Sequence, residues 1–231
     1  MTTRSVPTTS PRATDRTRAL LACGVIAGPV FVGTSTVQVL TRDGFDLSRQ
    51  PISLLSLGDH GWIQVATFVV AGGLSLAFAV GARQVLRSGR ASTWGPRLLA
   101  VYGVGLVAGG VFLPDPGLGF PPGTPDGIPD DLSWHGMLHA VAPPLANLGL
   151  VLACLVFARR FSAGRQRALA ASSVATAAAC LVLAAWPGID GAGVRLYVAC
   201  VLAFAWLSVL ALRLGGEYFG RSWAGSGATS D

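Results

Sequence analysis

Six long apolar stretches separated by short polar ones set the pattern of the chain. They run over Ala19 to Leu40, Trp62 to Ala82, Thr93 to Leu113, Ser133 to Phe157, Ala168 to Trp186 and Val194 to Leu214. Each approaches or exceeds the roughly 20 residues that an α-helix needs to cross about 30 Å of hydrocarbon. The pattern therefore predicts an all-α fold, an integral membrane bundle of six transmembrane helices.

The two ends of the chain are polar by comparison. Residues 1–17 are rich in Thr, Ser, Pro and Arg and carry almost no apolar side chains. Such a segment cannot bury enough surface to offset the entropy of ordering, so we expect a disordered tail. The six-helix domain is expected over residues 18–214, followed by a second tail at 215–231.

The charged residues predict the orientation of the bundle. Fourteen of the 17 arginines fall in the two tails and in the stretches that follow the second and fourth apolar runs, whereas eight of the 11 acidic residues fall on the other side. Positive charge accumulates in cytoplasmic loops. We therefore expect a plasma-membrane protein with both termini in the cytoplasm and with loops 41–61 and 114–132 facing outward.

The amino-acid composition is typical of a membrane protein and indicates which kind of partner to expect. Hydrophobic residues make up 52% and charged residues 12% of the chain, against about 25% charged in an average soluble domain. The net charge of +6 would suit a nucleic-acid-binding protein only if the basic residues formed one face of a soluble domain. The arginines lie in short loops between apolar runs. We therefore expect the chain to contact the lipid bilayer and to bind no nucleic acid.

Small residues recur at a spacing that favours close helix packing. Gly24 and Gly28 lie four apart in the first run, and Gly105 and Gly109 lie four apart in the third. Such pairs let helix backbones approach one another in lipid. They predict faces through which the chain contacts a second copy of itself or another membrane partner. The four cysteines lie in apolar runs without metal-ligand spacing and are interpreted as core residues.

The second outward loop is dominated by proline and glycine over Pro114 to Leu132. These residues exclude a helix or a central strand. Either an ordered coil pinned by its prolines or a mobile lid fits this composition. The first outward loop contains the segment Gln50 to Gly58, which is apolar enough to lie in the membrane interface.

Directly after the second loop, His135 and His139 lie four residues apart. On a helix they share one face, which suits two ligands of one metal ion. A zinc site needs at least three protein ligands. The third would come from a residue on the same outward side, namely Asp115, Asp126 or His60. The interpretation favoured by the sequence is a pair of interfacial histidines bonded to loop carbonyls and to Asp115, because two histidines alone are a weak metal signal. The alternative is a metal site with zinc held by His135, His139 and Asp115.

Three blocks of sequence in this outward region resemble a known family. They are Gln50 to Gly58 with Gly61 to Gln64, then Asp115-Pro116 with Phe120 to Pro125, then Trp134 to His139. Through them the chain resembles the bacterial and archaeal membrane family called domain of unknown function 998. The resemblance spans roughly Arg18 to Arg213 and implies the multi-pass fold, but no activity. Members similar to this chain often carry His-Pro where this chain has Gln50-Pro51.

The sequence leaves function open between several classes. The leading interpretation is a multi-pass plasma-membrane protein with an outward-facing His/Asp site. One alternative is a metal-dependent hydrolase of a lipid or lipid-linked substrate, in which zinc activates water and Ser53 or His60 orients the substrate. Its candidate catalytic residues are Ser53, Asp115, His135 and His139. The other alternative is a non-catalytic accessory or assembly subunit. A solute carrier has the least support, because no pair of broken helices occurs in the runs.

Overall fold

The computed structural model describes residues 11–226, and the side chains of residues 15–220. This part of the chain is all-helical and contains no β-strand, as predicted. Its six α-helices are α1 (Pro11–Thr41), α2 (Gly61–Val85), α3 (Trp94–Val111), α4 (Trp134–Ala163), α5 (Arg167–Ala185) and α6 (Ala192–Ser226). A short 3-10 helix, η1 (Ile52–Ser56), lies between α1 and α2.

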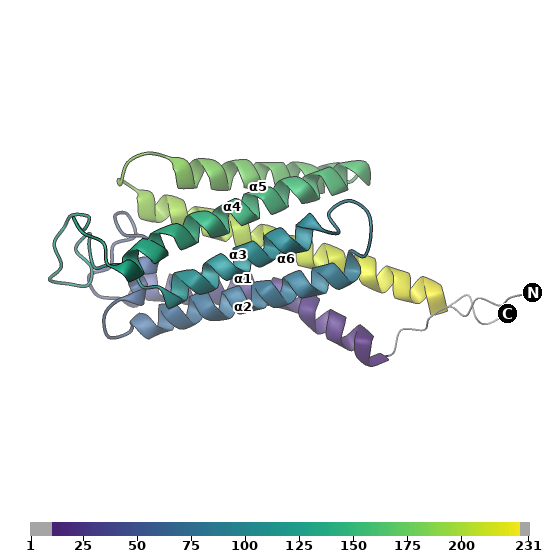
Figure 1. The fold of residues 1–231 in the computed structure, drawn as a ribbon, viewed down its shortest axis with the longest axis horizontal. Coiled ribbons are helices and arrows are strands. Elements are labelled where there is room, and N and C mark those ends of the chain that lie inside the picture. The colour runs from purple at the N-terminus through teal and green to yellow at the C-terminus, as the bar shows by residue number, and fades with distance from the viewer. Residues whose placement is uncertain (1–10, 227–231) are drawn as a thin grey trace, which may run out of the picture.

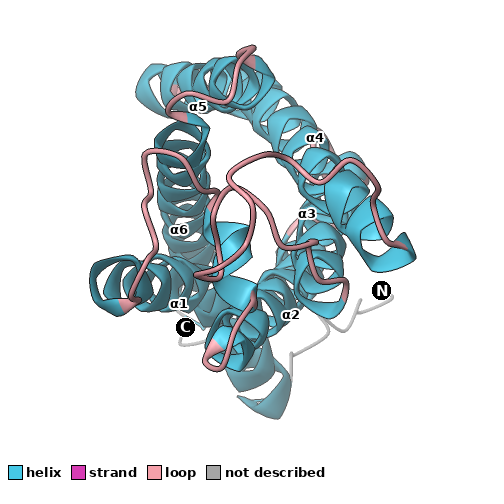
Figure 2. Ribbon diagram, turned by 90° about the vertical axis from the view of Figure 1, so that its left-hand side faces the viewer, coloured by secondary structure: helices cyan, strands magenta, loops and turns pink. Residues whose placement is uncertain are grey.

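The helices run side by side and form one bundle (Figure 1). Each helix packs against the next one in the chain, and α6 closes the arrangement by packing on α1 (Figure 2). The loops α1–α2, α3–α4 and α5–α6 lie together at one end, which we call the cap end. The shorter loops α2–α3 and α4–α5 lie at the opposite end, with the start of α1 and the end of α6.

Five of the helices are long and apolar enough to cross a membrane, judged by length and composition. They are α1, α2, α4, α5 and α6. The remaining helix, α3, has 18 residues and begins with Trp94-Gly95-Pro96-Arg97, so it is both shorter and more polar at its start. Five of the six predicted spans thus meet these criteria, which indicates a membrane protein.

Two helices extend beyond the apolar runs that predict them. α1 begins at Pro11, so residues 11–17 are helical and not disordered, whereas residues 1–10 lie outside the described part. α6 continues to Ser226, through much of the predicted tail. Two contacts lie within these extensions: Thr17 donates a hydrogen bond to Gln84 of α2 at 2.7 Å, and the guanidinium of Arg18 lies over the ring of Phe219, 4.8 Å from its centre.

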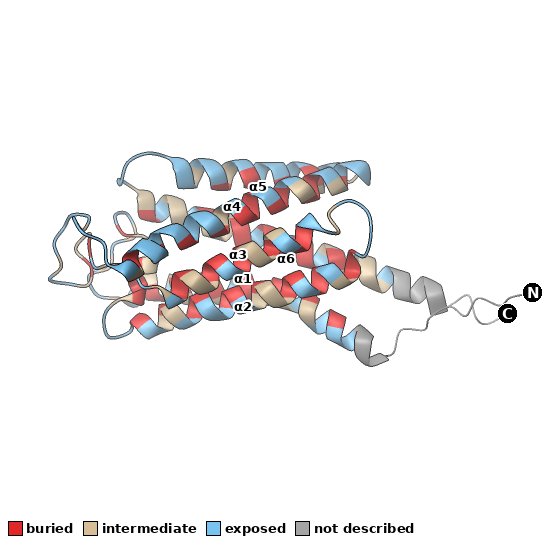
Figure 3. Cartoon of the chain, in the orientation of Figure 1, coloured by how far each residue is buried: buried red, intermediate tan, exposed pale blue. Residues whose placement is uncertain are grey.

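Aromatic rings from several helices meet in the centre of the bundle. The ring of Phe31 on α1 lies 4.8 Å from that of Phe204 on α6 and 5.2 Å from that of Phe68 on α2. Tyr102 on α3 also packs on Phe204, at 5.7 Å. The outer surface is also apolar, with exposed leucines and valines along α4 and α5 (Figure 3). An apolar exterior around a packed core is what a bundle in lipid requires.

The predicted glycine pairs lie inside the bundle. A Cβ atom on Gly105 would stand 2.6 Å from that of Ala146 on α4, and one on Gly24 would stand 2.6 Å from the ring of Phe78 on α2. Gly28 and Gly109 are buried as well. These faces are occupied by the chain's own helices. Contact of the chain with a second copy or another membrane partner stays a prediction.

Polar side chains pair with one another between the helices. Gln38 of α1 donates to Gln64 of α2 at 2.7 Å, and Gln64 donates to Ser35 at 3.2 Å. All three are buried. In a bilayer such groups have no water to bond, so pairing them ties α1 to α2 near the cap end.

The contact at Gly105 gives a first prediction. Gly105→Ala should reduce the free energy of unfolding by about 1–3 kcal/mol, because the added methyl group overlaps Ala146. Thermal unfolding of the purified protein in detergent measures this. The matched control is Gly73→Ala on α2, where no atom lies within 4 Å of the added Cβ. That variant should keep the stability of the unmodified chain. Equal losses in both variants would refute the packing argument.

Candidate functional site

The two long loops at the cap end fold against each other around Phe120. We call loops 42–60 and 112–133 together the cap. The Phe120 side chain is 1% exposed. The edge of Phe45 from the first loop meets its ring at 5.3 Å, and the guanidinium of Arg42 lies 5.5 Å from its centre. The ring of Phe120, from the second loop, thus forms the buried core against which the first loop packs.

Arg42 joins this core to the segment that leads into α2. Its guanidinium donates to the carbonyl oxygen of Leu57 at 2.6 Å and to that of Leu55 at 3.4 Å. Burial lowers the pKa of Arg42 from its ordinary value, and the charge of nearby Asp59 opposes that shift. The arginine stays charged, because its ordinary pKa lies far above neutral. It therefore supplies strong donors to carbonyls that no helix satisfies.

Gln50 connects the two loops through its side-chain amide. The amide nitrogen donates to the carbonyl oxygen of Leu118 at 2.8 Å, and the amide oxygen accepts from the backbone of Asp46 at 2.7 Å. The side chain is buried. Gly193 of α6 lies directly against the carbonyl of Gln50, with no room for a Cβ atom. Gln50 therefore holds the two loops of the cap together.

The proline-rich loop is an ordered coil, the first of the two alternatives from the sequence. Gly119 and Gly123 adopt positive φ angles of 76° and 93°. Backbone bonds then cross the loop, from Leu118 to Gly127 and from Gly119 to Pro125, each at 2.9 Å. These bonds give the loop internal structure that does not depend on a regular element.

Asp115 and Ser133 together cap the N-terminus of α4. A carboxylate oxygen of Asp115 accepts from the backbone N–H of Ser133 at 2.8 Å, and the hydroxyl of Ser133 accepts from that of Gly136 at 3.0 Å. Gly136 lies so close to Asp115 that a Cβ atom would stand 1.9 Å from a carboxylate oxygen. Acidic and hydroxyl side chains stabilise a helix N-terminus in this way. This is a structural role for Asp115.

The two histidines have separate environments. His139 is buried and donates from Nδ1 to the carbonyl oxygen of Phe112 at 2.7 Å. His135 stacks on its neighbour Trp134, with ring centres 3.7 Å apart. Phe112 packs beside both of these rings. The bond of His139 to a loop carbonyl is the contact expected for an interfacial histidine.

The structure does not arrange the predicted metal ligands as a metal site. Within the described residues, no group of three or more His, Cys, Asp or Glu side chains could hold a metal ion. Asp115 caps the start of α4, and His139 uses Nδ1 for the carbonyl of Phe112, so these atoms already have structural partners. His60 is exposed at the start of α2, and Ser53 is half-buried on η1. Catalytic roles for Ser53, Asp115, His135 and His139 stay predictions.

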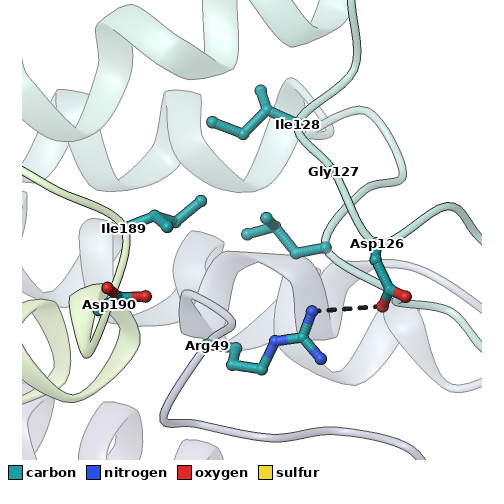
Figure 4. Close-up of a pocket in the computed structure, with 7 residues that line it drawn as sticks. Arg49, Asp126, Gly127, Ile128, Ile189 and Asp190 are labelled. Carbon is teal, nitrogen blue, oxygen red and sulfur yellow. Dashed lines mark hydrogen bonds and ion pairs between the residues drawn. The ribbon is translucent and has the colours of Figure 1, made fainter.

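The structure does form a recess at the cap end, between the second cap loop and the α5–α6 loop (Figure 4). It encloses about 350 Å³. Its lining residues are Arg49, Leu118, Asp126, Gly127, Ile128, Ile189 and Asp190. At its edge, Arg49 and Asp126 form an ion pair at 3.2 Å. Sequence reasoning considered only Asp126, because the other residues lie in three loops whose proximity no local pattern reveals.

The buried ring of the cap gives a second prediction. Phe120→Ala should destabilise the cap by about 3–5 kcal/mol, because it empties the centre of the two loops. Limited proteolysis of the purified protein should then cleave residues 112–133 faster than in the unmodified chain. Ile128→Ala, at a side chain that is 67% exposed, is the control and should leave the rate unchanged. Identical rates for all three proteins would show that Phe120 does not order the cap.

Comparison with known proteins adds the family. The family model described as "Protein of unknown function (DUF998)" matches residues 25–213. No curated protein and no solved structure matches the chain. The matched region covers all three blocks that build the cap and the starts of α2 and α4, and nearly all of the bundle. The chain therefore belongs to the DUF998 family.

Proposed function

We propose that the protein is a six-span plasma-membrane protein that binds an amphipathic molecule at its outward-facing cap. The sixth span is α3. Although its start is polar, α3 runs back along α2 from the opposite end to the cap end (Figure 1). Its 18 residues correspond to about 27 Å at 1.5 Å per residue, which is close to the thickness of the hydrocarbon core.

Tryptophans support two membrane interfaces at the ends of the bundle. Trp62, Trp134 and Trp186 are exposed at the cap end. At the opposite end Trp94 is exposed, with the guanidinium of Arg97 5.6 Å from its ring centre. Tryptophan is enriched where hydrocarbon meets headgroups. The arginine bias then supports a cytoplasmic location for the opposite end and an outward one for the cap.

The recess between the cap and the α5–α6 loop is the observation that carries the binding proposal. It combines the cation of Arg49 with the carboxylates of Asp126 and Asp190. Ile128 and Ile189 reach into the same space from two loops (Figure 4). Because Asp126 is already paired with Arg49, the carboxylate of Asp190 is the one left to receive a ligand cation. Binding sites of this kind join an apolar lining with a few polar groups that orient the ligand.

These groups fit a zwitterionic lipid or lipid-linked molecule. The guanidinium of Arg49 uses only Nη2 for Asp126, so its other N–H donors would bond a phosphate. An ammonium group would pair with Asp190, and the start of an acyl chain would contact Ile128 and Ile189. Trp186 at the end of α5 lies three residues before Ile189, so the recess opens near the membrane interface. A lipid could then enter it from the outer leaflet.

The alternatives from the sequence are less supported. A metal-dependent hydrolase would need His135, His139 and Asp115 to form a metal site, and the described residues contain no group of three or more His, Cys, Asp or Glu side chains that could hold a metal ion. An accessory subunit would need a contact surface other than the glycine faces, which the bundle already uses. The exposed leucines and valines of α4 and α5 suit lipid equally well.

Asp190 supplies the test of this function. The purified protein in detergent would be titrated with dihexanoylphosphatidylethanolamine, and retained lipid would be counted by native mass spectrometry. Asp190→Asn should weaken binding about threefold to fivefold, since a partly exposed ion pair contributes up to about 1 kcal/mol. The change keeps the shape of the side chain and leaves the cap untouched.

Two controls make this result specific. Asp43→Asn removes an exposed carboxylate at the same end, outside the recess, and should not alter binding. Dihexanoylphosphatidylglycerol lacks the ammonium group, so its retention should be insensitive to Asp190→Asn. Equal retention of the ethanolamine lipid by the unmodified and Asp190→Asn proteins would contradict the proposal.

A further inference from the structure

A second recess lies at the end of the bundle opposite the cap, and every charged side chain that lines it is an arginine. It is an open recess of about 320 Å³ where the α2–α3 loop meets the turn between α4 and α5. Its lining residues are Arg90, Arg160, Ala163, Gly164 and Gln166. Nothing in the cap contributes to it, so it is independent of the site described above.

The polar side chains of this recess are arranged as donors. Arg160 is held in place by bonds to Glu217 at 2.8 Å and to the backbone carbonyl of Arg90 at 3.4 Å. Gln166 accepts from Arg213 through Oε1 at 2.9 Å. The Gln166 oxygen is thereby occupied, and its amide N–H groups are left to donate. In the described part of the chain, the exposed guanidinium of Arg90 makes no hydrogen bond or ion pair.

The charge around the recess is positive and not balanced. The carboxylate of Glu217 forms ion pairs with both Arg160, at 2.8 Å, and Arg213, at 3.6 Å. Glu217 is 16% exposed and lies between these two arginines. Adding Arg90 gives three guanidinium groups for one carboxylate. An anion in the recess would supply the missing negative charge.

The position of the recess indicates which kind of anion binds there. Arg90 lies four residues before Trp94, whose exposed ring and neighbouring Arg97 mark the membrane interface at this end. Lipid phosphates lie at that depth. Ala163 and Gly164 have too little side chain to fill the space between the arginines. Guanidinium groups bond phosphate oxygens strongly and with fixed geometry.

We infer that this recess binds the phosphate group of an anionic lipid between Arg90, Arg160 and Gln166. Basic pockets between transmembrane helices bind anionic headgroups in the same way. A soluble phosphate would offer the same chemistry, so the experiment has to separate the two sources.

The test uses the full chain in detergent and dioctanoyl phosphatidic acid as the probe, with retained lipid counted by native mass spectrometry. Arg90→Gln should weaken binding about tenfold, as expected from losing one charge-assisted hydrogen bond to phosphate. Ala163→Leu fills the recess without changing the charge and should also weaken binding. Arg87→Gln is the control, because it removes an arginine of the same loop region that does not line the recess.

The pattern of losses decides the outcome. Weaker binding in Arg90→Gln and Ala163→Leu, with Arg87→Gln unchanged, supports the site. Failure of millimolar inorganic phosphate to displace the lipid supports the lipid as the ligand, whereas full displacement would assign the site to soluble phosphate and overturn the lipid assignment. Equal losses of lipid binding in Arg90→Gln and Arg87→Gln would show that binding depends on general surface charge and not on the recess. That result, or no loss in either recess variant, would overturn the inference.

Discussion

Hydrocarbon offers no hydrogen-bond partners, and this constraint accounts for most of the architecture. A chain with five helices apolar enough to cross a membrane must satisfy its backbone within those helices. Polar side chains between the helices therefore pair, as Gln38 does with Gln64. Because lipid is as apolar as the helix surfaces, association depends on close packing. Glycine provides it where α3 meets α4 at Gly105. Backbone that is not helical therefore lies at the ends of the bundle.

At the cap end the irregular backbone becomes ordered by other means. Two loops far apart in the sequence share one buried ring, Phe120, and the donors of Arg42 and Gln50 satisfy carbonyls that lie outside any helix. This order matters for function, because the recess takes Arg49 from one cap loop and Ile128 from the other. A mobile lid could not hold such groups in a fixed arrangement. The proposed binding of a zwitterionic amphiphile therefore depends on the cap.

Much of the fold could be predicted from the sequence, because hydropathy over 20 residues reports directly on a membrane helix. The first turns of α1 could not, since they depend on contacts such as that of Thr17 with Gln84. Spacing placed His135 and His139 on one helix face, but it could not show that His139 bonds Phe112. Glycine spacing indicated close packing without identifying the neighbour. The recess combines three separate loops, which no local pattern connects.

The proposed topology has six helices that cross the membrane and a cap that faces outward. Labelling with a membrane-impermeant thiol reagent in intact cells tests it at the two ends of α3. The exposed positions Asp130, in the cap, and Ser88, between α2 and α3, would be changed to cysteine one at a time. The unmodified chain gives the background from its four native cysteines. We expect Asp130→Cys to be labelled in intact cells and Ser88→Cys only after lysis. Labelling of both positions in intact cells, or of Ser88→Cys alone, would contradict it.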